Sequence, residues 1–285
     1  MAGAFKEKLA AAVRRSDSLV CVGLDVDPGR VPAFVRERAD WIGYFNAGIM
    51  EATADLVCCY KPNLGFYEAL GAEGWQGLRQ TLAAVPRDVP VLLDAKRGDI
   101  GSTAEAYARA LFEDLGGDAA TVNPYMGFDA VAPFLAYGDR GVFVLCKTSN
   151  PGAADFQDLP CEVSGERRPL FEQVARAAVG WNRRGNVGLV VGATQPAAFR
   201  AVRAIAPALP LLVPGVGAQG GDLAVAVREG ADASGTGILV ASSRAVLYAS
   251  SGQDWQAAAR AAAAELRDAI NALRGAKSDG ARAIP

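Results

Sequence analysis

Three charged residues suited to acid–base chemistry follow an apolar run in residues 92–103, LLDAKRGDIGST. Asp94 and Lys96 are two positions apart, so on an extended strand their side chains share a face, with Cα atoms about 6–7 Å apart. Asp99 follows, near the expected start of a helix. A lysine held between two aspartates is a proton donor and a cation that stabilises developing negative charge. The segment therefore predicts a catalytic site.

Two alternatives apply to this segment. A lysine at a strand end could form a Schiff base, but it must first lose its proton, and neighbouring carboxylates stabilise the ammonium form. A structural alternative is that residues 102–105, STAE, form a capping box at the helix start, where an acidic residue also suits the helix dipole. The capping box accounts for Ser102 but leaves Lys96 unexplained.

A second candidate site lies in residues 213–222, VPGVGAQGGD, and 241–248, ASSRAVLY. Gly215 and Gly217 would let backbone amides approach an anion, and Arg244 could supply a bidentate guanidinium. Phosphate sites in barrel enzymes are commonly built from the loops after the seventh and eighth strands. The alternative is an ordinary turn beside a surface arginine.

The composition excludes several classes of function. The 285 residues contain no histidine, which excludes a Ser-His-Asp triad, a histidine general base and the commonest zinc sites. The net charge is −2 and the basic pairs are scattered, so no nucleic-acid-binding face is expected. No apolar segment approaches the roughly 18 residues of a membrane span. Residues 5–15 read as a first helix, without the apolar centre of a secretory signal.

Cysteine usage favours a cytoplasmic protein. The five cysteines have no metal-like spacing, and four of them lie in apolar, strand-like runs. Buried free thiols in a reducing cytoplasm are therefore expected, with no disulfides and no metal site.

Short apolar runs alternate with helix-like segments along the chain. Each run is apolar throughout, as in parallel strands covered on both faces. The runs are 19–24, 56–60, 89–93, 119–122, 142–145, 187–191, 211–213 and 233–240, and clear helices are expected at 169–184 and 196–206. This order predicts an α/β fold, a (β/α)₈ TIM barrel in a single domain over residues 1–274, with 275–285 as a flexible tail. An open doubly wound sheet is the alternative, although no dinucleotide-binding fingerprint follows the first run.

Active sites in such barrels lie at the carboxyl ends of the strands. The residues there are charged or polar: Asp25, Lys61, Asp94, Lys96, Lys147 and Ser149. A long loop, TSNPGAADFQDLPCEVSGERRP, follows the fifth run, and loops of that length are usually functional. No role is assigned to its residues 153–168.

The central segment DAKRGDIGST resembles the Asp-x-Lys-x-x-Asp-Ile-x-x-Thr signature of the orotidine 5′-monophosphate decarboxylases, in their longer bacterial branch. Further stretches resemble the same family in order along nearly the whole chain. They are GLDVDP, CYKPNLGFYE, TSNPGA, VVGAT, PGVGAQGGD and SSRAVLY.

The resemblance implies a role for each matched residue. Lys61, Asp94 and Lys96 would surround the reacting carbon, with Lys96 donating the proton. The family further implies a homodimer with shared sites, in which Asp99 reaches the active site of the neighbouring subunit. The resemblance also implies that Ile100 and Thr103 act across the interface, that Asp25 and Lys61 contact the ribose and that Ser149 contacts the pyrimidine. Gln219 and Arg244 would bind the phosphate, and Ser243 would be a further substrate contact. Gly215 and Gly217 would form the phosphate loop.

The implied reaction converts orotidine 5′-monophosphate to UMP and CO₂ without a cofactor or metal. The electrons left at C6 lie in the ring plane, so a fixed ammonium must stabilise them directly. Keto-gulonate-phosphate decarboxylases and hexulose-phosphate synthases share Asp-x-Lys-x-x-Asp but use magnesium, and Ile100 and Thr103 favour the orotidylate branch over them. A non-catalytic phosphate-binding barrel is a further alternative, disfavoured by the clustered charges.

Overall fold

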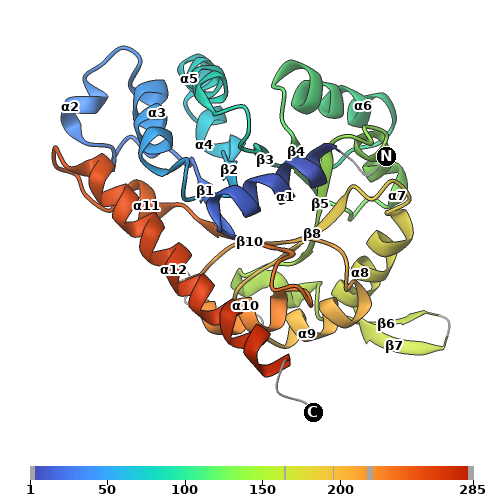
Figure 1. Ribbon diagram of the computed structural model, residues 1–285. Coiled ribbons are helices and arrows are strands. Elements are labelled where there is room, and N and C mark those ends of the chain that lie inside the picture. Colours follow the sequence, from blue (N-terminus) through green and yellow to red (C-terminus); the bar gives the residue numbers. More distant parts are fainter. Residues whose placement is uncertain (1–3, 164, 195, 217–220, 282–285) are drawn as a thin grey trace.

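A computed structural model describes residues 4–163, 165–194, 196–216 and 221–281 of the chain and has a parallel eight-stranded sheet at its centre (Figure 1). Each of the eight strands of this sheet is short and largely buried, as the uniformly apolar runs predicted. The strands are β1 (Val20–Gly23), β2 (Cys59–Lys61), β3 (Leu92–Arg97), β4 (Ala119–Val122), β5 (Gly141–Lys147), β8 (Val187–Val191), β9 (Leu211–Val213) and β10 (Ile238–Ser242).

The sheet curls until its two end strands meet. The strand order is β2-β1-β10-β9-β8-β5-β4-β3, and parallel bridges from Tyr60 to Val91 and from Asn63 to Asp94 join β2 to β3. The Asp94 backbone N–H donates to the Pro62 carbonyl at 3.0 Å across this junction. The predicted barrel is therefore confirmed, and the open doubly wound sheet is excluded.

Helices surround the barrel (Figure 1). Three of them match the sequence expectation closely, α1 (Ala4–Ser16), α8 (Leu170–Trp181) and α9 (Pro196–Ile205). The others are α2 (Ala33–Arg36), α3 (Trp41–Thr53), α4 (Leu64–Glu68), α5 (Gly71–Ala84), α6 (Gly101–Arg109) with a π-helical turn η1 (Ala110–Asp114), α7 (Phe128–Leu135), α10 (Leu223–Gly230), α11 (Arg244–Leu247) and α12 (Trp255–Ala281). Helix α12 thus continues past residue 274, where the expected tail begins, and the flexibility of that tail stays a prediction. Within the described residues, no helix is long and apolar enough to cross a membrane.

The core has two parts. A large cluster fills the space between strands and helices, and a smaller one fills the barrel interior with side chains that include Phe5, Cys21, Cys59, Leu92 and Phe143. Helix α1 lies across the barrel (Figure 1), and its Phe5 ring meets the Phe143 ring edge to face at 5.9 Å. All five cysteines are free and four are buried, as expected.

The long loop after β5 contains regular structure that the sequence did not indicate. It starts with a 3₁₀ turn η2 (Pro151–Asp155) and continues into an antiparallel hairpin of β6 (Pro160–Val163) and β7 (Glu166–Pro169). Figure 1 shows this hairpin projecting away from the barrel beside α8. The two strands are mostly exposed, so no buried apolar run marked them in the sequence.

Candidate active site

Asp94 is the centre of a charged cluster at the carboxyl ends of β1 to β4. Its Oδ2 accepts a hydrogen bond from Lys61 Nζ at 3.0 Å, and its Oδ1 accepts one from Lys96 Nζ at 2.6 Å. The Asp94 side chain is 10% exposed and the Lys61 side chain 5%, whereas the Lys96 side chain is 47% exposed. Two cations therefore share one buried carboxylate, and Lys96 is the more exposed of the two.

Electrostatics keeps the buried pair charged. Burial alone would raise the pKa of Asp94, but the positive charges of Lys61 and Lys96 outweigh it and hold that pKa well below its usual range. Burial alone would likewise lower the pKa of Lys61, but the carboxylates of Asp25 and Asp94 outweigh it and raise that pKa. The site is therefore an array of fixed opposite charges at neutral pH.

The backbone at Lys96 differs from the sequence expectation. Lys96 has φ of +49°, in the left-handed region, and the pairing of β3 with β4 shifts register between Leu93 and Arg97. The strand backbone is therefore irregular at Lys96, although the Asp94 and Lys96 side chains still meet, as predicted. A non-glycine residue held in this region is strained, which is typical of functional sites.

Thr121 on β4 holds this strained backbone in place. Its hydroxyl accepts a hydrogen bond from the Lys96 backbone N–H at 2.9 Å and donates one to Asp94 Oδ1 at 2.8 Å. Thr121 is 1% exposed. One buried hydroxyl therefore positions both the carboxylate and the lysine. Thr121 was not predicted from the sequence, although a threonine inside an apolar run was a signal that could have identified it.

Asp25 extends the cluster toward β10. Its Oδ1 lies 4.0 Å from Lys61 Nζ, and its Oδ2 accepts a hydrogen bond from the Ser243 hydroxyl at 2.7 Å. The approach is close because residue 23 is a glycine: a Cβ at Gly23 would lie 1.9 Å from Ser243 Oγ. Tyr248 Oη donates to the Asp25 carbonyl at 2.9 Å. Ser243 therefore orients Asp25, a role that its assignment as a substrate contact did not include.

Among the described residues, no hydrogen bond or ion pair connects Asp99, Ile100 or Thr103 to the charged cluster. Asp99 is half-buried and its Oδ1 accepts from the Ile100 backbone N–H at 2.8 Å; Ile100 and Thr103 are exposed. The alternative of a capping box is excluded, because the helix starts at Gly101, with Ile100 as the N-cap and no side-chain cap. Ser102 lies within the helix, two positions after the N-cap.

Ser149 and Lys147 follow the end of β5. Ser149 packs against Gly192, where a Cβ would lie 2.6 Å from the Ser149 backbone nitrogen. Lys147 is buried and its Nζ donates to Asp158 Oδ1 at 2.7 Å. Gln157 and Thr148 exchange two further hydrogen bonds. These contacts hold the long loop against the end of β5, and the ion pair with Asp158 gives Lys147 a structural role.

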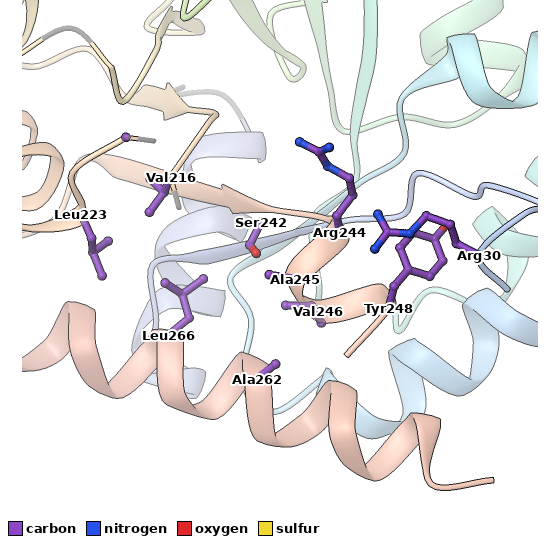
Figure 2. Close-up of a pocket in the computed structure, with 11 residues that line it drawn as sticks. Arg30, Val216, Leu223, Ser242, Arg244, Ala245, Val246, Tyr248, Ala262 and Leu266 are labelled. Atoms are coloured by element: carbon purple, nitrogen blue, oxygen red, sulfur yellow. The ribbon is translucent and has the colours of Figure 1, made fainter. Parts of the chain in front are cut away.

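The second candidate site is a pocket of about 680 Å³ beside β9 and β10. Its lining includes Arg244 and Tyr248, together with Arg30 from the loop after β1 (Figure 2). Gly215, two residues after the end of β9, has φ of +90°, a conformation that favours glycine. Gly217 and Gln219 lie outside the described residues. Arg30 was not recognised in the sequence because its loop lies some two hundred positions from Arg244.

Chemically, the two sites complement each other. The charged cluster offers an ammonium beside a carboxylate, and the pocket offers two guanidinium groups. Among the described residues, no group of three or more histidine, cysteine, aspartate or glutamate side chains is placed to hold a metal ion. The arrangement suits a ligand that has an anionic end in the pocket and a reacting end at Lys96.

Comparisons with known proteins agree with this arrangement. The profile of the orotidine 5′-phosphate decarboxylase / HUMPS family matches residues 18–262. A relative from Azoarcus sp. (strain BH72), named orotidine 5′-phosphate decarboxylase, is 55% identical over 272 residues, covering 95% of this chain and 99% of the relative. One of the same name from Roseiflexus castenholzii is 54% identical over 269 residues, covering 94% and 97%.

Solved structures give the same result. The Leishmania donovani OMP decarboxylase superposes with a TM-score of 0.81 at 45% identity, covering 95% of this chain and 98% of that one. A putative orotidine-monophosphate decarboxylase from Toxoplasma gondii superposes with a TM-score of 0.86 at 41% identity, covering 96% and 97%.

Proposed function

The chain belongs to the orotidine 5′-phosphate decarboxylase / HUMPS family, and we propose that it converts orotidine 5′-monophosphate to UMP and CO₂ in pyrimidine biosynthesis. It is a carboxy-lyase by this assignment. The relatives named orotidine 5′-phosphate decarboxylase, about half identical over nearly the full chain, favour this branch over the sugar-phosphate enzymes. The observation that carries the proposal is the Lys61–Asp94–Lys96 array, which holds an exposed ammonium beside a buried carboxylate.

Lys96 supplies the proton and the stabilising charge. As the C6–CO₂ bond breaks, its electron pair stays on C6 in the plane of the ring, out of reach of the π system. The Lys96 ammonium stabilises this pair and then transfers a proton to C6, so that UMP forms. Because the strained backbone and Asp94 hold Lys96 before substrate arrives, little reorganisation is needed during the reaction. No cofactor takes part in this scheme.

Asp94 acts on the departing group and on Lys96. Its carboxylate is ionised at neutral pH, since its pKa is held low. Placed near the substrate carboxylate, it repels that group, and the repulsion is relieved as neutral CO₂ leaves. It also orients Lys96 through the 2.6 Å hydrogen bond. Lys61 compensates the buried charge of Asp94 throughout.

The remaining contacts follow the length of the substrate. Asp25 and Lys61 bind the ribose hydroxyls, and Ser149 binds the pyrimidine. Gln219 and Arg244 hold the phosphate, with Gly215 and Gly217 in the loop beside it and Ser243 behind Asp25. Binding energy from the remote phosphate can then drive catalysis at C6 and not affinity alone.

The direct test follows the loss of orotidylate ultraviolet absorbance with purified protein and no added metal. We expect turnover, with no change when a chelator is added. Hexulose or keto-gulonate phosphates, supplied with magnesium, serve as the comparison substrates. Turnover of those sugars without turnover of orotidylate would overturn the proposal in favour of the magnesium-dependent branch.

We further propose that the chain works as a cytoplasmic homodimer with shared sites. Exposed apolar side chains follow the neighbouring strands β3, β4 and β5, and such gatherings are typical of subunit interfaces. They are Ile100, Tyr125, Met126, Phe128 and Phe156, with exposures of 47–78%. Asp99 and Thr103 lie at this surface, where they would complete the site of the partner. The five free cysteines favour the cytoplasm.

Mixing two inactive variants tests the shared site. Asp99→Ala and Lys96→Ala would each be inactive alone. After random subunit exchange, half of the dimers are mixed and one site in each is intact, so about a quarter of wild-type activity should return. If subunit exchange is proven and no activity returns, the shared site is overturned. As a control for the mixing procedure, the Lys96→Ala protein is mixed in the same way with a Lys6→Ala protein.

A further inference from the structure

We propose that Arg30 is a second phosphate-binding guanidinium, which forms with Arg244 a two-arginine site for the phosphate dianion of the nucleotide. The inference rests on the proposed function and deepens it. It draws on the lining of the pocket, on the stacking of Arg30 and on the lack, within the described part of the chain, of a carboxylate paired with either arginine.

Arg30 and Arg244 reach the same pocket from different parts of the barrel. Arg30 belongs to the loop after β1, and Arg244 begins α11 after β10. Because β1 and β10 are neighbours in the sheet, their carboxyl-terminal segments are side by side. Figure 2 shows the two guanidinium groups on one side of the pocket, with the Arg30 side chain lying across the Tyr248 ring.

Arg30 is held in position before any ligand binds. Its guanidinium carbon lies 4.5 Å from the centroid of the Tyr248 ring. The Tyr248 hydroxyl is fixed in turn, since it accepts from the Asp27 backbone N–H at 2.7 Å and donates to the Asp25 carbonyl at 2.9 Å. The Arg30 backbone N–H donates to the Asp27 carbonyl at 2.9 Å. Both the stacking surface and the loop that carries Arg30 are therefore organised.

Stacking leaves the binding edge of the guanidinium available. The Tyr248 ring meets the flat face of the group, while its N–H donors point outward in the plane and can bind an anion bidentately. Within the described residues, neither Arg30 nor Arg244 has a carboxylate within ion-pair distance, whereas Arg38, Arg79 and Arg260 are each paired. Two unneutralised cations on one pocket repel each other unless an anion lies between them.

The charge of the ligand matches that of the pair. A phosphate monoester carries about −1.5 to −2 charges at pH 7. Arg244 alone would balance about half of this charge, and Arg30 supplies the rest. Since the Tyr248 hydroxyl also binds the Asp25 backbone, a phosphate held by Arg30 is connected through Tyr248 to the ribose end of the site.

The test measures nucleotide binding to Arg30→Ala by titration calorimetry, so it does not depend on turnover. We expect UMP to bind about tenfold more weakly, as for the loss of one charge-assisted hydrogen-bonding group. Inorganic phosphate, used as a competitor of UMP, should lose affinity in parallel. Arg30→Lys keeps the charge but loses the bidentate guanidinium, so its affinity for UMP should lie between that of wild type and that of Arg30→Ala.

Arg38→Ala is the matched control. Arg38 also stacks on a tyrosine, with its guanidinium carbon 4.0 Å from the Tyr44 centroid, but it is paired with Asp40 and does not line the pocket. UMP and phosphate should bind this variant as they bind wild type. Unchanged UMP affinity in Arg30→Ala would overturn the inference, as would weaker UMP binding with unchanged phosphate competition, which would indicate a structural effect through Tyr248.

The two proposals can fail separately. A chain that binds UMP through Arg30 but leaves orotidylate intact would refute the proposed reaction and leave the two-arginine site standing. If the protein decarboxylates orotidylate but Arg30→Ala binds UMP as tightly as wild type, the proposed reaction stands and the two-arginine site is refuted.

Discussion

The two ends of the barrel are built from the same strands but have opposite characters. Cys21 on β1 is the register partner of Cys59 on β2, and both are fully buried thiols in the apolar interior. Two residues further along, Gly23 is the partner of Lys61, and the chain then reaches Asp25. The apolar end is covered by Phe5 of α1, whereas the opposite end carries the charged cluster.

The difference shows how the fold separates stability from chemistry. At the apolar end, burial raises the pKa of the Cys58 and Cys59 thiols well above their ordinary value, so these groups stay protonated and unreactive. At the charged end, opposite charges outweigh burial and keep Asp94 and Lys61 ionised. The apolar end can thus supply rigidity without entering the reaction. The following changes, from the largest expected effect to the smallest, test this division.

Lys96→Ala should lower kcat by about 10⁴-fold or more, because it removes both the proton donor and the cation at C6. Stability should change by no more than about 1 kcal/mol, since the Lys96 side chain is half-exposed and Asp94 keeps Lys61. Steady-state kinetics and urea unfolding measure the two effects, with Lys6→Ala on α1 as the control. Near-normal turnover of Lys96→Ala would contradict the proton-donor role.

Phe143→Ala should show the reverse pattern at the apolar end. Phe143 is fully buried and packs on Phe5, so its truncation should cost about 3–5 kcal/mol of unfolding free energy. At a temperature where the variant is folded, kcat should stay within about twofold of wild type. Phe143→Leu should show a smaller loss of stability. A large fall in kcat of the folded variant would mean that the two ends are coupled.

Asp94→Asn should remove a contribution to stability that depends on pH. The pKa of Asp94 is lowered in the folded protein, so its contribution is complete above the unfolded-chain value of about 3.9 and is lost as the pH falls below it. At pH 6 the variant should be about 3 kcal/mol less stable than wild type, because Lys61 loses a buried partner. Urea unfolding from pH 6 to pH 3 should show this gap narrowing below pH 4, and a gap that widened in acid would contradict the assignment of charge.

Thr121→Val should have the smallest effect of the four changes when each effect is expressed as a free energy. The change keeps the shape of the side chain but leaves the Lys96 backbone N–H without its acceptor and Asp94 without one donor. We expect kcat to fall about tenfold, equivalent to about 1.4 kcal/mol, with KM little changed. Thr121→Ser, which keeps the hydroxyl, should restore most of the rate. Equal losses in both variants would indicate a packing role for the methyl group.

The strands could be predicted where burial alone defines them. The runs at 119–122, 187–191 and 211–213 coincide with β4, β8 and β9. By contrast, β3 was expected to end at residue 93 but continues to Arg97, because Asp94 is buried by pairing with lysines and not by apolar character. Hydropathy cannot recognise a strand whose charged residues neutralise one another across neighbouring strands. The hairpin β6–β7 was not predicted either, because its residues are largely exposed and form no apolar run.

By itself, the sequence determined the periodic burial that makes a (β/α)₈ barrel, the delivery of Asp25, Lys61, Asp94 and Lys96 to one end of it, and the resemblance that identified the reaction. These features are local, because each depends on residue type and on spacing within a strand or its loop. Only the tertiary structure decided that Thr121 holds Lys96 in a left-handed conformation, that Ser243 orients Asp25 and that Arg30 joins Arg244 at one pocket. Each of these contacts joins segments that barrel closure brings together, and a hydrogen bond between distant segments leaves no periodic trace in the chain.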